Sequence, residues 1–252
     1  MIDCIQPNSH DKYKKNCSTT VPMTFSILAF DEKSGGFAAA SATGNLCVGG
    51  WVLRGNIDSG LVASQGTSPS TFWRDEALRA MRMGADAATA LAQVVEPDTG
   101  KGFRQLLTLD REGRTAGHTG DRSLPYAGHE CAPNLVVGGN MLAKREVVDA
   151  MLATFMATDA LLGERLLAAL GAARAAGGDY RGLMSASLLC LTPERPPLDL
   201  RIDSSDDPLG DLRRLYDQCN SSPYKDWLDE VPVAEDRHRA PDLEKLESAK
   251  TG

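Results

Sequence analysis

The sequence lacks a long apolar run, an excess of positive charge and a close pair of cysteines. No stretch approaches the ~20 apolar residues of a transmembrane helix, so no membrane partner is expected. With 34 acidic and 27 basic residues among 252, the net charge is -7, and the positive field that attracts nucleic acid is absent. The six cysteines form no CxxC pair, which favours reduced thiols.

Nucleotide-binding and serine-hydrolase motifs are missing as well. The glycine pairs Gly138-Gly139 and Gly177-Gly178 belong neither to a GxGxxG motif nor to a GxxxxGK motif followed by Ser or Thr. No GxSxG motif occurs, so an α/β-hydrolase triad has no support. We therefore expect no cofactor.

The two ends of the chain differ in composition from the rest. Residues 1–22 are polar and aperiodic, and we expect a disordered extension or a stretch upstream of the true start. No apolar segment of a secretory signal follows their three lysines, so we expect a cytoplasmic protein. Residues 221–252 are charged and punctuated by proline, which predicts a loosely docked tail. Residues 23–220 then form one domain.

Between these ends, runs of strands alternate with pairs of helices. Alternating and β-branched residues predict strands, and apolar stripes at helical spacing predict helices. Ser68 is the expected N-cap of the first helix, because Pro69 follows it. The expected strands are 24–30, 36–43, 46–53, 60–65, 103–109, 115–119, 134–138, 185–192 and 198–203. The expected helices are 69–83, 86–95, 147–155, 162–170 and 208–218.

This order has no β-α-β alternation, which favours the α+β class over a parallel sheet. Helix pairs placed between runs of strands can cover the outer faces of two stacked antiparallel sheets. We therefore predict a four-layer α-β-β-α sandwich.

The first strand begins with the most informative residue. Removal of Met23 would make Thr24 the N-terminal residue, which combines a hydroxyl nucleophile with a free α-amine. An α-amine pKa of roughly 7.7–8.0 suits a general base at neutral pH. The simpler interpretation is that Thr24 is a β-former that opens a strand.

Five segments carry a family resemblance: 23–31 (MTFSILAFD), 41–50 (SATGNLCVGG), 117–120 (GHTG), 139–142 (GNML) and 177–182 (GGDYRG). Together they resemble an uncharacterised bacterial family of unknown function that is grouped with the N-terminal nucleophile (Ntn) hydrolases and whose members begin Met-Thr-Phe-Ser-Ile. The resemblance covers about residues 23–220. It implies the same α-β-β-α sandwich that the order of elements predicts.

The resemblance also implies an activity. Thr24 would attack a carbonyl carbon and hydrolyse the C–N amide bond of a small molecule, which can itself carry a carboxylate. The chain departs from the family at two points. Residues 1–22 precede Met23, so a free Thr24 amine needs a downstream start or self-cleavage. Gly44 stands where many relatives have Lys, which removes a charge near the nucleophile.

Four polar residues are further candidates for the site. Asn140, at a predicted strand end, could donate to an oxyanion, although Gly-Asn pairs also punctuate turns. Gln65 lies where a strand joins the first helix, a place that suits a substrate carboxylate, although capping by Ser68 explains the same pattern. Arg181 could bind a substrate carboxylate and Asp179 could orient it, or the two could pair locally.

His118, on a predicted short strand, could contact the substrate. His129 and Cys131 are expected in a loop. A zinc site is not favoured, because the His-x-Cys spacing is not a strong zinc pattern and a fourth ligand is not evident. We expect no metal.

Three functions are compatible with these residues. The main hypothesis is an Ntn-type amidohydrolase with Thr24 as nucleophile and Asn140 as oxyanion donor. The second is a non-catalytic binding or assembly protein with the same sandwich. The third is a Ser- or His-dependent hydrolase that uses His118. The apolar helix faces are also compatible with a homodimer.

Overall fold

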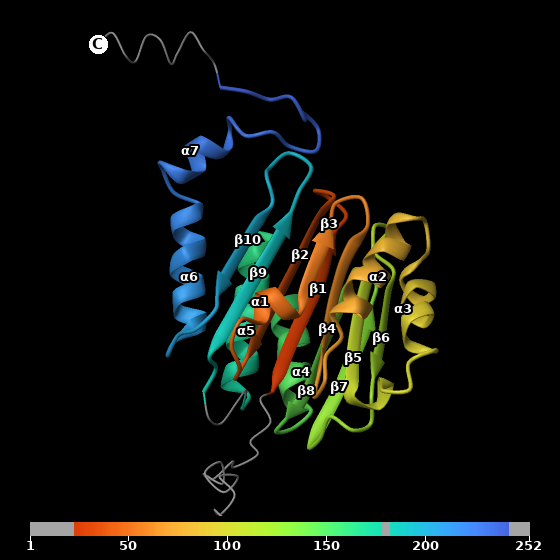
Figure 1. The fold of residues 1–252 in the computed structure, drawn as a ribbon. Coiled ribbons are helices and arrows are strands. Elements are labelled where there is room, and N and C mark those ends of the chain that lie inside the picture. The colour runs from red at the N-terminus through yellow and green to blue at the C-terminus, as the bar shows by residue number, and fades with distance from the viewer. Residues whose placement is uncertain (1–22, 178–181, 242–252) are drawn as a thin grey trace, which may run out of the picture.

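The computed structural model describes residues 23–177 and 182–241, and the expectation for residues 1–22 lies outside this part (Figure 1). The strands are β1 (Thr24–Asp31), β2 (Gly36–Thr43), β3 (Leu53–Asn56), β4 (Gly60–Gly66), β5 (Arg104–Asp110), β6 (Thr115–Thr119), β7 (Tyr126–Ala132), β8 (Leu135–Leu142), β9 (Ser185–Leu191) and β10 (Leu198–Ile202). The helices are α1 (Val48–Trp51), α2 (Thr71–Arg82), α3 (Ala87–Val95), α4 (Glu146–Ala157), α5 (Leu162–Ala175), α6 (Pro208–Cys219) and α7 (Tyr224–Leu228).

The strands form two antiparallel sheets, which confirms the predicted α+β class. Sheet A has six strands in the order β10-β9-β2-β1-β8-β7, and sheet B has four in the order β3-β4-β5-β6. The hairpin β1–β2 turns at residues 32–35, so that Thr24 is directly opposite Thr43. On its other side, β1 pairs with β8, which places Asn140 opposite Thr24. Strand β1 is therefore an interior strand with a partner on both edges.

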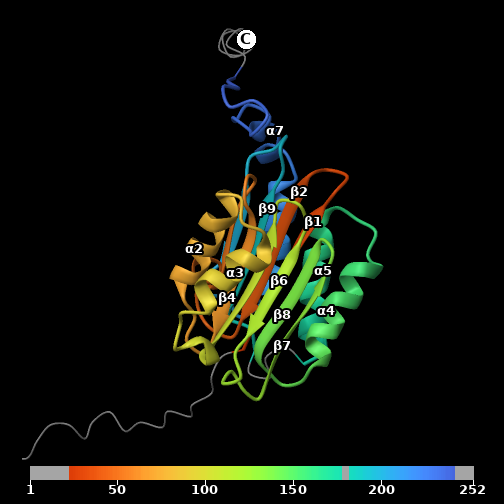
Figure 2. The same ribbon diagram turned by 90° about the vertical axis from the view of Figure 1, so that its right-hand side faces the viewer.

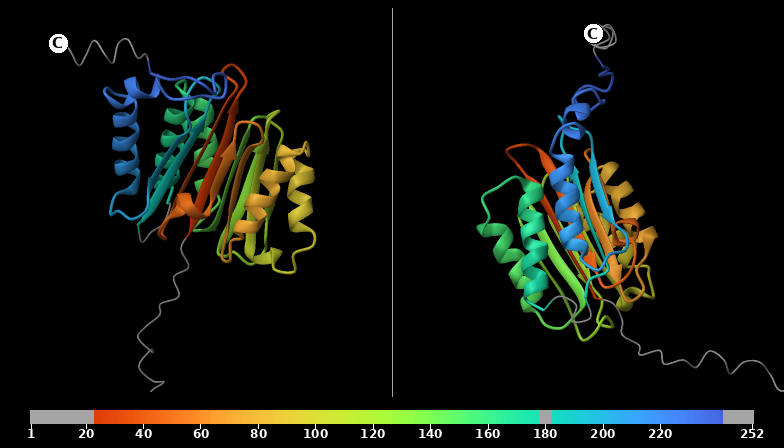
Figure 3. Two further views of the ribbon diagram at one scale, coloured as in Figure 1. Left: turned by 45° about the horizontal axis from the view of Figure 1, so that its top comes forward. Right: turned by 90° about the vertical axis from the view of Figure 1, so that its left-hand side faces the viewer.

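Helices α4, α5 and α6 lie outside sheet A, helices α2 and α3 lie outside sheet B, and the sheets face each other (Figures 2 and 3). One apolar cluster joins the outer face of sheet A to α4, α5 and α6, and it includes Phe25, Val137 and Leu170. A second cluster fills the space between the sheets, with Leu28 of sheet A and Leu107 of sheet B among its members. A third cluster joins sheet B to α2 and α3. Alternate residues of β1 therefore point into different cores.

The strand expected at 46–53 is wrong, because this apolar run forms the short helix α1 followed by β3. Cys47 adopts a left-handed conformation (φ 60°), which starts the helical turn. Val48 and Val52 are four residues apart, so one helical turn directs both side chains into the core between the sheets. An apolar run of this length does not distinguish a buried strand from a buried helix.

Two local expectations also need correction. Helix α2 begins later than expected, because the Ser70 side chain, and not that of Ser68, accepts the N–H of Trp73 as the N-cap. Ser68 instead accepts a hydrogen bond from Arg104 through its hydroxyl (3.2 Å). The segment that carries His129 is strand β7 and not a loop, because it pairs along β8.

The chain beyond residue 220 includes α7 and returns to sheet A at the connection between β9 and β10 (Figure 1). Val233 is buried, and the N–H of Glu235 donates to the Pro193 carbonyl (3.3 Å). In residues 23–177 and 182–241, none of the helices has the length and apolarity that crossing a bilayer requires.

The core between the sheets predicts a clear stability difference between two leucines. Leu107 is fully buried there, whereas the Leu161 side chain is 75% exposed. We expect Leu107→Ala to lower the free energy of unfolding by about 3 kcal/mol, and Leu161→Ala to change it by less than about 0.5 kcal/mol. Urea denaturation measures both. Equal losses would contradict the assignment of Leu107 to this core.

Candidate active site

A pocket of about 550 Å³ opens at the end of the sandwich where β1 begins. Its wall is made by the first residue of β1, the end of β2, the loop after β2 with α1, and the end of β4 with the turn that follows. Among the described residues that line it, none is Asp, Glu, Lys, Arg or His. The polar groups of the pocket are therefore hydroxyl, amide and backbone groups, they lie beside apolar side chains such as Trp51 and Met141, and the described lining carries no charge.

Thr24 lies at the inner end of this pocket and is 8% exposed. Its neighbour Phe25 points into the core outside sheet A, so Thr24 points the other way, toward sheet B. Thr43 and Asn140 are directly opposite Thr24 on its two partner strands and share its face of the sheet. The register of three strands thus brings two hydroxyls and one amide together.

The hydrogen bonds at Thr24 have a defined direction. Thr24 Oγ1 and Thr43 Oγ1 are 3.0 Å apart. Thr43 Oγ1 is also 2.6 Å from the carbonyl oxygen of Met23, which can only accept. The single hydroxyl proton of Thr43 is therefore donated to Met23, and the Thr24 hydroxyl donates to Thr43. The lone pairs of Thr24 Oγ1 are left available for a reacting carbon.

The Met23 carbonyl oxygen receives two hydrogen bonds. The second comes from the backbone N–H of Gly44, at 3.3 Å. The Met23 side chain is buried in the core outside sheet A. In this form of the chain, Thr24 carries a peptide nitrogen, and its preceding carbonyl is held by two donors.

Asn140 is the most unusual polar residue of the site. It lies inside β8, and not at a strand end as expected from the sequence. Its side chain is fully buried, and within the described residues neither Oδ1 nor Nδ2 has a hydrogen-bond partner. Leaving a buried amide unpaired costs about 1–3 kcal/mol, and buried polar groups are otherwise paired. A neutral donor held unpaired beside a hydroxyl is suited to stabilising an oxyanion.

A chain of buried hydrogen bonds crosses from sheet A to sheet B behind Thr24. Ser26 Oγ donates to Gln65 Oε1 (2.5 Å), and Gln65 Nε2 donates to Gln105 Oε1 (2.6 Å). Gln105 Nε2 donates in turn to Thr119 Oγ1 (2.8 Å) and to the Gly139 carbonyl (3.0 Å). These bonds tie the two sheets together and fix the backbone next to Asn140.

The chain ends at His129 of β7. Thr119 Oγ1 accepts from Gln105 and lies 2.8 Å from His129 Nδ1. A neutral imidazole with its proton on Nε2 accepts the Thr119 proton at this nitrogen. Burial lowers the pKa of His129 below its ordinary value, which favours that neutral form.

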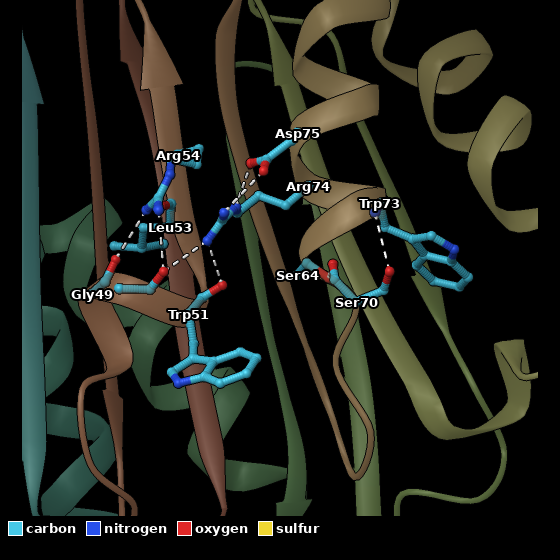
Figure 4. A network of polar contacts seen from close by, with 10 residues as sticks. Gly49, Trp51, Leu53, Arg54, Ser64, Ser70, Trp73, Arg74 and Asp75 are labelled. Atoms are coloured by element: carbon cyan, nitrogen blue, oxygen red, sulfur yellow. Dashed lines mark hydrogen bonds and ion pairs between the residues drawn. The ribbon is translucent and has the colours of Figure 1, made fainter.

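Two arginines hold the wall of the pocket that α1 forms, as Figure 4 shows. Arg74 is 4% exposed, and its guanidinium donates to the carbonyls of Gly50 and Trp51, each at 2.8 Å. Arg54 donates to the carbonyls of Gly49 (3.3 Å) and Leu53 (2.7 Å). The carbonyls of Gly49, Gly50 and Trp51 belong to α1, and a four-residue helix cannot pair them all internally, whereas Leu53 is the first residue of β3. The arginines therefore supply the hydrogen bonds that keep α1 in place.

The other predicted site residues lie elsewhere. Gln65 borders the pocket, but its oxygen and nitrogen are both engaged in the chain between the sheets. His118 is on the opposite face of sheet B, where its ring meets Trp73 (5.7 Å between centroids) and its Nε2 lies 3.1 Å from the Lys101 carbonyl. Asp179 and Arg181 lie outside the described residues. Of the predicted set, Thr24 and Gln65 line the pocket, and Asn140 is buried opposite Thr24 without lining it.

Three residues of the site were missed from the sequence. Thr43 could have been found, because the predicted hairpin around residues 31–35 already places it opposite Thr24. Gln105 and Arg74 offered no comparable signal, since their partners are distant in sequence. Across the described ranges, no group of three or more His, Cys, Asp or Glu side chains is arranged to hold a metal ion.

Comparison with known proteins assigns the chain to a family. A family model described as a family of unknown function, DUF1028, matches residues 24–212. A crystal structure of a Silicibacter pomeroyi protein, also described as DUF1028, is 44% identical over 87% of this chain and 100% of that chain, with a TM-score of 0.83. No curated protein matches the chain. The chain belongs to the DUF1028 family.

The unpaired amide of Asn140 predicts an inverted stability effect. We expect Asn140→Leu to leave the free energy of unfolding unchanged or to raise it by about 1–2 kcal/mol, because an unsatisfied buried amide is replaced by an apolar group of similar size. Gln105→Leu is the matched control, since that amide has partners at both ends. We expect it to lower the same free energy by about 2–4 kcal/mol. Denaturation curves in which Asn140→Leu costs as much as Gln105→Leu would show that Asn140 has a structural role.

The hydrogen bonds of Arg74 predict that it stabilises α1. Arg74→Gln should lower the free energy of unfolding by about 2–4 kcal/mol, because carbonyls of α1 lose bonds to a charged donor. Arg79→Gln, on the exposed side of the same helix, should change it by less than about 0.5 kcal/mol. Hydrogen exchange at residues 48–52 should become faster only in Arg74→Gln. Unchanged hydrogen exchange at residues 48–52 in Arg74→Gln would show that Arg74 does not stabilise this wall of the pocket.

Proposed function

We propose that this chain is an Ntn-type amidohydrolase in which Thr24, freed from Met23, hydrolyses the C–N amide bond of a small molecule. The observation that carries the proposal is the placement of the Thr24 hydroxyl opposite the fully buried, unpartnered amide of Asn140 beside a pocket of about 550 Å³. A nucleophile and a neutral oxyanion donor are the two groups that acyl transfer requires.

The stacking of the elements supports the Ntn grouping. Helices, sheet A, sheet B and helices follow one another, which is the α-β-β-α order that the Ntn resemblance implies. The candidate nucleophile is the first residue of an interior strand, and it faces the space between the sheets. Fold alone does not establish a reaction, so the proposal depends on the site.

The proposed reaction uses groups of this chain only. The free α-amine of Thr24 takes the hydroxyl proton while Oγ1 bonds to the substrate carbonyl carbon. The oxyanion accepts from Asn140 Nδ2. The C–N bond then breaks as the α-ammonium returns the proton to the leaving amine, which leaves an ester on Thr24. Water, deprotonated by the same amine, hydrolyses this ester and releases the carboxylic acid.

Thr24 needs a free amine, and two routes can produce it. Translation from Met23 followed by removal of that residue is one. The other is self-cleavage, in which Thr24 Oγ1 attacks the Met23 carbonyl carbon, the Met23–Thr24 C–N bond breaks, and water hydrolyses the resulting ester. The two donors on the Met23 oxygen, Thr43 Oγ1 and the N–H of Gly44, support the second route, because they would stabilise the oxyanion of that step.

The lining of the pocket favours an uncharged substrate group next to Thr24. A carboxylate placed there would lose its hydration without meeting a cation among the described lining residues. A substrate carboxylate would have to bind beyond these lining residues. Gly44, which replaces the Lys of many relatives, is consistent with a neutral pocket.

A second candidate function is a non-catalytic binding protein. The observation that favours it is the buried side chain of Met23, which packs into the core outside sheet A and would be lost on maturation. In that case Thr24 remains peptide-linked and serves as a strand residue hydrogen-bonded to Thr43.

Expression of the chain from Met23 tests the catalytic proposal. Hydrolysis of small amides and cyclic imides should occur with the parent form, fall by at least about 10³-fold in Thr24→Ala, and be retained in part in Thr24→Ser. Intact mass must show that Met23 is absent from all three proteins. Equal turnover by the parent form and Thr24→Ala would eliminate Thr24 as the nucleophile.

A further inference from the structure

A second pocket, of about 540 Å³, lies at the open edge of the sandwich, between β3 of sheet B and β9–β10 of sheet A. The segment 232–237 forms part of its wall. None of its lining residues lines the Thr24 pocket, and α1 lies between the two, with Gly49 on one side and Val48 on the other. Its volume is in the range of small-molecule sites.

Positive charge gathers in this pocket, although the chain as a whole is acidic. Five arginines line it: Arg54, Arg82, Arg195, Arg201 and Arg237. Only two carboxylates, Asp58 and Asp199, line it as well, so five positive and two negative charges give the lining a net charge of +3 on a protein of net charge -7. Arg201 is paired with Asp199 (2.6 Å). Within residues 23–177 and 182–241, no ion pair involves Arg82, Arg195 or Arg237.

The surroundings of Arg54 in this pocket change the pKa of its guanidinium. Burial and the charges of Arg74 and Arg201 lower the pKa of its guanidinium, and Asp75 and Asp199 offset this only in part. The guanidinium is therefore partly removed from water and lies near two other positive charges. A bound anion would relieve this repulsion.

The inner wall of the pocket adds an unpaired polar atom and an apolar surface. Ser187 is 1% exposed, and its Oγ has no hydrogen-bond partner among the described residues, although it borders the pocket. The neighbouring lining residues Leu189, Leu191 and Val233 are buried and apolar. A ligand that fills this space therefore needs an anionic head group, an apolar body and an acceptor for the Ser187 hydroxyl.

We propose that this second pocket is a binding site for a small organic anion, with a phosphate or carboxylate head group held by arginines and an apolar body against the leucines. Guanidinium groups bind both oxyanions through paired N–H donors. The site is independent of the Thr24 chemistry, and it stands whether or not Thr24 is catalytic.

Isothermal titration of the full chain with phenyl phosphate and with benzoate tests the site. We expect saturable one-site binding of at least one of these anions, no binding of benzyl alcohol, and weaker binding of inorganic phosphate, which lacks the apolar body. Tighter binding of phenyl phosphate assigns a phosphate head group, and tighter binding of benzoate assigns a carboxylate. Absence of saturable binding of either aromatic anion at millimolar concentration would overturn the proposal.

Matched double variants locate the binding. Arg195→Gln with Arg237→Gln should weaken it at least about tenfold, because two charge-assisted contacts are removed. Arg79→Gln with Arg111→Gln removes the same charge from exposed positions outside the pocket and should change affinity less than about twofold. All four arginines are exposed, so both proteins should fold, which thermal unfolding checks. If both double variants bound the anion equally weakly, the loss would come from the overall charge of the protein, and the proposed site would be wrong.

Ser187→Ala gives a second, independent measurement. It removes the unpaired hydroxyl, so thermal stability should be unchanged or higher while anion affinity falls. Thr24→Ala should leave affinity unchanged, since Thr24 lines the other pocket. Loss of anion binding in Thr24→Ala would place the ligand in the Thr24 pocket and contradict the assignment.

Discussion

The antiparallel register of β1 between β2 and β8 is the constraint on which the site depends. It sets Thr24 opposite Thr43 on one side and opposite Asn140 on the other, with all three facing sheet B. A shift of one residue would turn Thr24 into the core outside sheet A and move Phe25 toward the pocket. The apolar residues of β1 hold this register, because Phe25 and Ile27 fill one core and Leu28 fills the other.

The space between the sheets changes character along its length. At one end it is packed with leucine, valine and alanine side chains, and toward Thr24 it becomes a layer of serine, threonine and glutamine side chains joined across the sheets. Ser26, Gln65 and Gln105 satisfy one another there, so this polar layer costs little. Asn140 is the amide of this layer without a partner among the described residues, and Ser187, which lies opposite Ser41, is unpaired as well. In the proposed mechanism Asn140 donates to the oxyanion, whereas Ser26, Gln65 and Gln105 hold the two sheets together.

The sequence predicts the parts of this arrangement that depend on neighbours in the chain. The hairpin around residues 31–35 and the helices near Asp86 and Pro208 follow from turn, capping and periodicity signals, and the structure has them. Within the strand expected over 46–53, residues 48–51 form a helix whose carbonyls are paired by Arg54 nearby and by Arg74 from a distant position. Likewise, no local pattern shows that His118 shares the outer face of sheet B with Leu106, or that Asn140 is unpaired.

Acylation by a small β-lactone is the most direct measurement of whether Thr24 is a nucleophile activated by its own amine. Peptide mass analysis of the Met23-free protein should find one adduct, on the peptide 24–33, that forms more slowly in Asn140→Leu as the oxyanion donor is lost. A form that retains residues 1–23 should not react at Thr24. Equal acylation of Thr24 with and without the preceding residues, or an adduct elsewhere only, would contradict the central role of its free amine.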